Sequence, residues 1–137
     1  AAEFEKFSSL MPADTASKCR HIVTENKGVT ESVACLRAGD LARFGELMNA
    51  SHISLRDDYQ VTCRELDLLH DEALKMEGVA GERMTGAGFG GCAVALVENA
   101  AADKVESNLR KIYKKETGIK LEVYRTSACG GVARTEI

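Results

Sequence analysis

The sequence contains no tryptophan and one proline, and it has neither an excess of basic residues nor a long apolar run. Its 18 lysines and arginines stand against 21 aspartates and glutamates, which gives a formal net charge of −3. This balance argues against a nucleic-acid binder, because such proteins normally show a basic patch. No apolar stretch approaches the roughly 18 residues of a membrane span, and no basic-then-apolar signal opens the chain. We therefore expect the 137 residues to form one globular domain with no nucleic-acid and no membrane partner.

Cysteine motifs for metal binding or redox chemistry are also missing. The five cysteines are odd in number and widely spaced, and none of them forms a CxxC pair. They are Cys19, Cys35, Cys63, Cys92 and Cys129. This pattern predicts reduced, buried thiols in a cytoplasmic protein. The first residue is not methionine, which indicates a processed chain or a part of a longer one.

The first part of the chain carries helical patterns. A short amphipathic segment, Glu3–Met11, should end at Pro12. From about residue 16 to 38, apolar residues recur at steps of three and four, which predicts a longer helix with one mostly apolar face. Gly39 is the expected stop of that helix, and Asp40 is the expected N-cap of the next one.

A further helix is predicted in the middle of the chain. Thr62 and Glu65 stand three residues apart, just ahead of an apolar helical stripe. This spacing is typical of a capping box, in which two side chains satisfy free N–H groups at the start of a helix. Gly78 should end this helix.

The last part of the chain changes to patterns typical of strands. Strands are predicted at 79–85, 92–97 and 119–123, with one more from about Gly131. Between the second and third strands, Asn99 is expected to cap a helix that Gly118 closes. Helices followed by strand, loop, strand, helix and further strands indicate an α+β fold, with helices packed on one face of an antiparallel sheet.

The loop between the first two predicted strands, TGAGFGG, is unusually rich in glycine. It matches the pattern G-x-G-x-x-G, but a dinucleotide-binding turn requires a helix to begin there, and an apolar strand-like run follows instead. A P-loop is excluded because no Gly-Lys-Ser/Thr follows, and a protein-kinase loop because no V-A-I-K strand follows. The loop is therefore either an anion-binding nest of backbone N–H groups or a packed hairpin loop without a ligand. Phe89 is expected to anchor it to the core.

Four segments carry a family resemblance. They are GERMTGAGFGGCAVALV, RAGDLARFGELMNASHISLRDDYQVTCRELDLL, CRHIV and, more loosely, CGGVARTEI. The first resembles the third signature motif of the GHMP small-molecule kinases, in the form found in galactokinases. The second resembles the galactokinase segment that precedes this motif, above all at His52–Tyr59. The resemblance covers nearly the whole chain.

The resemblance implies a ferredoxin-like α+β fold in which residues 1–137 form the GHMP kinase C-terminal domain. The N-terminal domain, with its sugar signature, nucleotide loop and catalytic Asp, is absent, so this chain is expected to hold no catalytic residue and to be inactive alone. The implied reaction transfers the γ-phosphoryl group of ATP to the anomeric hydroxyl of galactose, with Mg²⁺. Two alternatives stay open: a related sugar kinase for N-acetylgalactosamine or arabinose, and a non-catalytic small-molecule binding module.

The resemblance also implies site residues. The expected phosphate-side and substrate-side loop consists of Thr85, Gly86, Ala87, Gly88, Phe89, Gly90 and Gly91. It should supply backbone donors beside the nucleotide loop of the missing domain. Ala87 replaces a glycine that is common in the motif, and it fits if its φ is negative. Gly88→Val is expected to reduce turnover of the complete enzyme while leaving the thermal midpoint nearly intact.

Supporting roles are implied for Arg56, Asp57, Tyr59 and Met84. Arg56 and Tyr59 are expected to brace helices near the loop. Asp57 and Asp58 are adjacent, and adjacent side chains rarely point to one centre, so a solvated or capping role is expected for them. His70 has acidic neighbours on one helical face, but a zinc site needs more ligands, and no metal site is expected.

Overall fold

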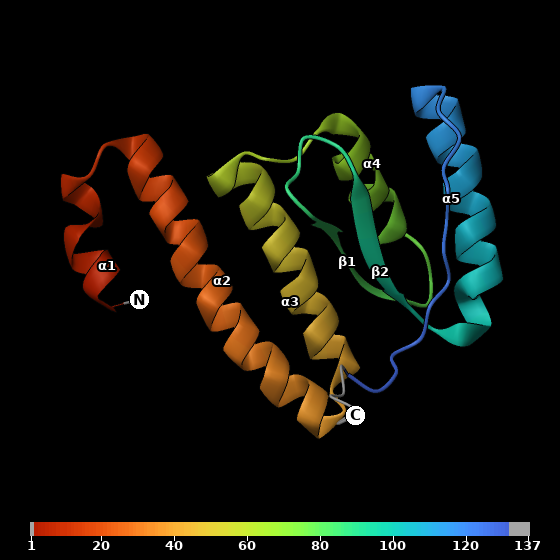
Figure 1. The fold of residues 1–137 in the computed structure, drawn as a ribbon, viewed down its shortest axis with the longest axis horizontal. Helices are drawn as coiled ribbons and strands as arrows, with labels where there is room; N and C mark the ends of the chain where they lie inside the picture. The colour runs from red at the N-terminus through yellow and green to blue at the C-terminus, as the bar shows by residue number, and fades with distance from the viewer. Residues whose placement is uncertain (1, 132–137) are drawn as a thin grey trace, which may run out of the picture.

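The computed structural model describes residues 2–131, and it arranges them as helices around a two-stranded antiparallel sheet (Figure 1). In chain order the elements are α1 (Ala2–Phe7), η1 (Ser8–Leu10), α2 (Ala13–Ala38), α3 (Leu41–Ser54), η2 (Leu55–Tyr59), α4 (Arg64–Ala73), β1 (Val79–Thr85), β2 (Cys92–Val97), η3 (Asn99–Ala101) and α5 (Ala102–Thr117). Helix α2 packs against α3, α3 packs against β1, α4 contacts both strands, and α5 packs against α4. This arrangement confirms the α+β class. No helix within the described range is long and apolar enough to cross a membrane.

The boundary between α2 and α3 follows the predicted local chemistry. Gly39 adopts a left-handed conformation with a φ of 72°, and its N–H and that of Asp40 bond to carbonyls in the last turn of α2. The Asp40 side chain then accepts a hydrogen bond from the backbone N–H of Arg43 at 3.0 Å. One glycine and one aspartate therefore end the first helix and begin the second.

Two other helix boundaries differ from the prediction. The N-cap of α4 is Cys63 and not Thr62, and its backbone carbonyl accepts from both Leu66 and Asp67 at 3.0 Å without a side-chain cap. Helix α4 ends at Ala73 and not at Gly78, where the sequence predicted its end. The residues between Ala73 and β1 form turns.

The start of α5 differs in a similar way. Asn99 opens a 3-10 turn, and α5 itself starts at Ala102 without a side-chain cap. Gly118 closes α5 in the left-handed region, as predicted.

The strands β1 and β2 confirm the predicted hairpin. Thr85 pairs with Cys92 at the loop end, and Val79 pairs with Val97 at the other end, with an irregularity between Val79 and Gly81. At the open end of the hairpin, the N–H of Glu98 donates to the carbonyl of Gly78 at 2.8 Å.

The predicted strand at 119–123 is wrong. Residues 119–131 form no regular structure; they first run back alongside α5 and then continue toward the junction of α2 and α3 (Figure 1). Arg110 of α5 donates to the carbonyl of Leu121, and Arg125 pairs with Asp103 at 2.7 Å and with Glu106 at 2.7 Å. These side chains hold the segment against the helix, so its alternating pattern does not lead to strand pairing. Residues 132–137, which include most of the predicted last strand, lie outside the described residues.

A small apolar cluster lies at the loop end of the sheet. Its buried members are Leu55, Leu66 and Met84, with Val61, Cys63 and Ala93 packed against them. Ala16, Met48, Ala73 and Val105 are also buried but lie outside this cluster. All five cysteines are unpaired, and none is fully buried; Cys92 and Cys129 are exposed, which corrects the expectation of buried thiols.

Candidate functional site

The loop between β1 and β2 has the backbone conformation that the glycines predict. Gly86, Gly88, Gly90 and Gly91 have φ values of 91°, 87°, 127° and 102°, a region that strongly favours glycine. Ala87 is not among the residues with positive φ, so alanine fits at this position. The loop therefore needs glycine at four positions. Ala87, the departure from the family motif, stands at a position that does not need glycine.

The loop is attached to the rest of the domain at its middle, through backbone atoms. The N–H of Phe89 donates to the carbonyl oxygen of Val61 at 2.7 Å. A Cβ added to Gly88 would lie 2.1 Å from the same oxygen, so only glycine permits this close approach. The Phe89 side chain is 75% exposed and its φ is 58°, which corrects the expectation that its ring anchors the loop in the core.

The same geometry corrects the expectation for Gly88→Val. A valine side chain would collide with the backbone of Val61, and both a Cβ and a β-branched side chain are unfavourable at a φ of 87°. The substitution should therefore lower stability as well as alter the loop.

Most backbone N–H groups of the loop are free. Within residues 86–91, Phe89 is the residue whose N–H finds a protein acceptor in the described part of the chain. Successive unbonded N–H groups in a turn can form a concave site that binds an anion. The loop residues are intermediate or exposed, so solvent or a ligand can reach these donors. The arrangement suits the oxygens of a phosphate group.

The stem of the loop is fixed by a group that the sequence did not reveal. The N–H of Met84 donates to Nδ1 of His52 at 3.1 Å, and Nε2 of His52 lies 3.2 Å from Oδ1 of Asp67. The His52 ring is fully buried and stacks on His70, with ring centroids 4.1 Å apart. Burial and the neighbouring His70 lower the pKa of His52, so the ring is neutral near pH 7.

Glu82 is the second group that sequence reasoning missed. It lies in β1, it is 2% exposed, and neither of its carboxylate oxygens has a hydrogen-bond partner among the described residues. Burial, followed by the charges of Asp67 and Asp71, raises its pKa from 4.5 to about 8. The sequence did contain one indication of this role. Glu82 is a charged residue inside the predicted strand 79–85, and a strand residue that faces the core is normally apolar.

The predicted supporting residues lie in and beside η2. Arg56 donates to Oδ1 of Asp57 at 2.9 Å, which raises the pKa of Arg56, and it also lies 3.7 Å from Asp71 of α4. The Tyr59 ring stacks on His21 of α2, with centroids 4.6 Å apart. Arg56 thus links η2 to α4 and the Tyr59 ring packs on α2, and their role in bracing helices near the loop stays a prediction.

Asp58 makes different contacts from its neighbour Asp57. It accepts hydrogen bonds from Ser17 at 3.2 Å, Arg20 at 2.9 Å and Ser54 at 3.3 Å. It therefore joins η2 to α2 and α3. The two adjacent carboxylates do not face a common centre, but Asp58 is neither solvated nor a helix cap, which corrects the expectation for this residue. Among residues 2–131, no group of three or more His, Cys, Asp or Glu side chains is placed to hold a metal ion.

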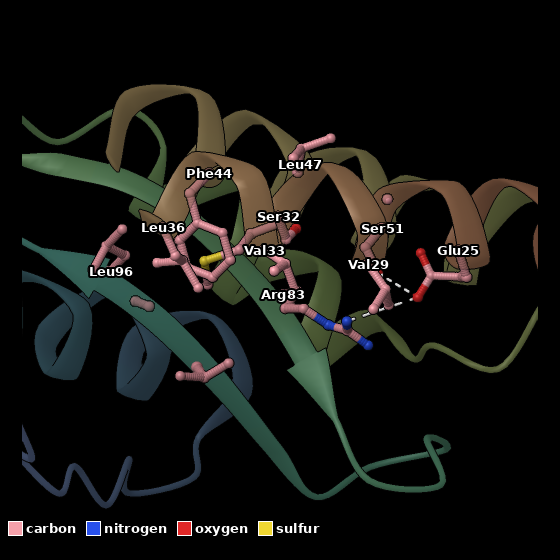
Figure 2. Close-up of a pocket in the computed structure, with 14 residues that line it drawn as sticks. Glu25, Val29, Ser32, Val33, Leu36, Phe44, Leu47, Ser51, Arg83 and Leu96 are labelled. Atoms are coloured by element: carbon pink, nitrogen blue, oxygen red, sulfur yellow. Dashed lines mark hydrogen bonds and ion pairs between the residues drawn. The ribbon is translucent and has the colours of Figure 1, made fainter. Parts of the chain in front are cut away.

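A separate groove of about 410 Å³ lies between α2, α3 and the two strands (Figure 2). Its lining is mostly apolar. At one side of the groove, Glu25 accepts a hydrogen bond from Ser51 at 2.9 Å and forms an ion pair with Arg83 at 3.7 Å. The exposed fractions of lining side chains on α2 are 63% for Val29, 44% for Val33 and 51% for Leu36. The apolar face predicted for α2 is therefore largely uncovered in the described structure. None of the loop residues 85–91 lines this groove.

The comparison with known families agrees with this fold and loop. The family described as GHMP kinases C terminal matches residues 32–115, which include both strands and the loop. The chain belongs to the GHMP kinase family. Its C-terminal domain fold is the one that the sequence resemblance implied.

Galactokinases are among the similar proteins. The chain is 45% identical to the galactokinase of Clostridium perfringens over 130 residues, which are 94% of this chain and 34% of that protein. It is 43% identical to the galactokinase of Fusobacterium nucleatum over 135 residues, which are 98% of this chain and 35% of that protein. The chain thus spans about a third of the length of these relatives.

Solved structures show the same relation. The crystal structure of Lactococcus lactis galactokinase complexed with galactose matches with a TM-score of 0.83 and 42% identity, over 87% of this chain and 31% of that one. The L. major mevalonate kinase in complex with R-mevalonate matches with a TM-score of 0.64 and 30% identity, over 80% of this chain and 32% of that one. A kinase with a different substrate therefore shares the domain, but with lower structural similarity.

Proposed function

We propose that this chain is the C-terminal part of a galactokinase, which transfers the γ-phosphoryl group of ATP to the anomeric hydroxyl of galactose. The observation that carries the proposal is the loop at Thr85–Gly91, with reachable and unbonded N–H groups, in a domain that matches a galactose-bound galactokinase. Phosphoryl transfer depends mainly on positioning and on stabilising negative charge. A rigidly attached loop of N–H donors contributes to both.

The role of the loop is to donate to phosphate oxygens and to close one side of the cleft. It holds no carboxylate or imidazole that could act as a general base, so the proton of the sugar hydroxyl is taken by a group outside the loop. Its donor set suits an anion, whereas Mg²⁺ binds oxygen ligands. Mg²⁺ would therefore be held by ATP and by residues outside the loop.

The partner of this domain is the N-terminal part of the same enzyme. The relatives are about three times as long as this chain, and the apolar groove over α2 and β2 is the kind of surface that another domain covers. The unpaired cysteines favour a cytoplasmic enzyme. A related sugar kinase for N-acetylgalactosamine or arabinose, or a non-catalytic binding module of the same fold, is the second interpretation.

A chimera tests the proposal. The chain would replace the matching third of Lactococcus lactis galactokinase, and ADP release would be measured with ATP and galactose, N-acetylgalactosamine or arabinose. We expect turnover with galactose in the chimera and none from the chain alone. A chimera that unfolds cooperatively but shows no turnover with any sugar, beside an active parent enzyme, would contradict a catalytic role. Turnover by the isolated chain would contradict the missing catalytic half.

A further inference from the structure

One edge of β1 is covered by a helix in place of a strand. Strand β2 pairs with β1 on one side, and no strand lies on the other side within residues 2–131. Helix α3 fills this side so closely that a Cβ on Gly45 would lie 2.2 Å from the carbonyl oxygen of Ala80. Contact this close puts α3 side chains within reach of the N–H groups at the uncovered edge.

Two α3 side chains accept those edge hydrogen bonds. Oδ1 of Asn49 accepts from the N–H of Glu82 at 2.9 Å, and Nδ1 of His52 accepts from the N–H of Met84 at 3.1 Å. The acceptors are three residues apart on a helix and the donors two residues apart on a strand, so both pairs lie along one line of contact. His52 is the last of these contacts before the loop begins at Thr85.

The two hydrogen bonds of His52 define one state of its ring. Nδ1 must be unprotonated, because the Met84 N–H can only donate. Nε2 must then carry the proton and donate to Asp67 of α4, 3.2 Å away. A single neutral imidazole therefore connects α3, α4 and the end of β1.

We propose that His52 is a positioning residue for the phosphate-side loop. Together with the Val61 carbonyl, which holds the N–H of Phe89 at 2.7 Å, it fixes the loop at its stem and at its middle. Both attachments lead to the same α3–η2–α4 unit. The loop is thus held in place against that unit and leaves its free N–H groups uncovered. The expected effect of His52 on turnover rests on the proposed function. The claim that His52 holds the loop in place does not.

Three variants separate positioning from ordinary core packing. In His52→Asn, the side-chain oxygen takes the place of Nδ1 and can still accept from Met84. In His52→Gln, the amide nitrogen takes the place of Nε2 and can still donate to Asp67, but the acceptor for Met84 is lost. His70→Gln is the matched control, because His70 is also buried and stacks on His52 but makes no hydrogen bond to β1 among the described residues.

The first readout is amide hydrogen exchange in the full chain, measured relative to amides in the middle of α5. In His52→Gln, we expect the amides of Met84 and Phe89 to exchange at least about tenfold faster, which corresponds to the loss of about one hydrogen bond. In His52→Asn and His70→Gln, both amides should stay within about threefold of the unmodified chain. If Met84 alone accelerates, or if His70→Gln gives the same pattern as His52→Gln, His52 does not hold the loop and the inference is overturned.

The second readout is kinetics in the Lactococcus chimera. His52→Gln should lower kcat at least about tenfold with the KM for galactose within about threefold, and His52→Asn should restore most of kcat, because the loss arises from misplaced donors. Equal kcat values in all three variants would overturn the inference. If the unmodified chimera shows no turnover, the proposed function fails, and the exchange data still decide whether His52 fixes the loop.

Discussion

Replacing Glu82 by glutamine should stabilise the domain at neutral and alkaline pH. The Glu82 side chain is 2% exposed, and both of its carboxylate oxygens lack hydrogen-bond partners among the described residues, with the unprotonated Nδ1 of His52 3.8 Å from Oε2. Burial first, and then the charges of Asp67 and Asp71, raise its pKa from 4.5 to about 8. Glutamine is neutral and has nearly the same shape, so it removes the cost of a buried charge without creating a cavity.

The sign and size of the effect follow from the raised pKa. The unfolded chain releases the Glu82 proton near pH 4.5 and the folded chain near pH 8, so the folded state binds more protons in between. The contribution to stability is therefore fully present below about pH 4.5 and is lost as the pH rises through about 8. At about 1.4 kcal/mol per pKa unit, the whole loss is roughly 5 kcal/mol, of which about 3 kcal/mol is reached by pH 7. His52 acts in the opposite direction, because its lowered pKa removes stability as the pH falls.

Urea unfolding of the full chain from pH 5 to pH 9 measures this effect as a difference between variants. We expect Glu82→Gln and the unmodified chain to differ by less than about 1 kcal/mol at pH 5 and by about 4 kcal/mol in favour of glutamine at pH 8. Subtraction removes the contributions of groups that do not contact Glu82, whereas His52, whose Nδ1 lies 3.8 Å from Oε2 of Glu82, can still contribute to the difference below about pH 6.5. Glu77→Gln is the matched control, because the Glu77 side chain is 91% exposed and its substitution should give a flat difference. A flat difference for Glu82→Gln as well would refute the reasoning.

Glycine substitutions give the remaining predictions. Gly45→Ala should destabilise the chain by about 2 kcal/mol or more, although alanine favours helices by about 1 kcal/mol, because its Cβ would lie 2.2 Å from the Ala80 carbonyl. Gly28→Ala, with nothing within 4 Å, should instead raise the thermal midpoint, and similar changes in the two variants would argue against tight contact between α3 and β1. In the loop, Gly88→Ala should lower the thermal midpoint clearly more than Gly86→Ala, because both positions have positive φ but only Gly88 faces a backbone oxygen at 2.1 Å. Equal midpoints would contradict the attachment of the loop at Gly88.

The elements that could be predicted from the sequence depend on local chemistry. Gly39 and Asp40 end one helix and begin the next through their own conformation and side chain, so two residues were enough. The β1–β2 hairpin followed from one weak strand pattern at 79–85 and one short apolar segment at 92–97, on either side of the glycine loop. The alternating pattern at 119–123 also suits a strand, but a strand needs the edge of another strand to pair with. The Leu121 carbonyl accepts a hydrogen bond from Arg110 instead. Pairing is a property of the fold, which local alternation does not reveal.

The site could be predicted only in part for a similar reason. The glycine loop is visible in the sequence because its backbone requirements select the residue type. The roles of His52 and Glu82 depend on the packing of α3 and α4 around β1. The groups that they contact are therefore distant in the sequence; Met84, for example, is 32 residues from His52. Single-sequence patterns contain no information on such contacts. The Phe89 side chain was misplaced because a large apolar residue was assumed to be buried, whereas its backbone N–H makes the contact.

The four loop positions require glycine for two different physical reasons. Gly88 is required by contact, since its missing Cβ lets the loop approach Val61, whereas Gly86, Gly90 and Gly91 have open space within 4 Å and are required by their positive φ alone. A flexible loop would lose conformational entropy on binding a phosphate group, and this loss would weaken the complex. Attachment at Gly88 and at the buried Met84 stem removes much of that freedom before a ligand arrives. The apolar strand that follows the glycines pairs with the stem and packs Ala93 against Met84, but none of its residues is fully buried, so the stem is held mainly from the side of α3 and α4.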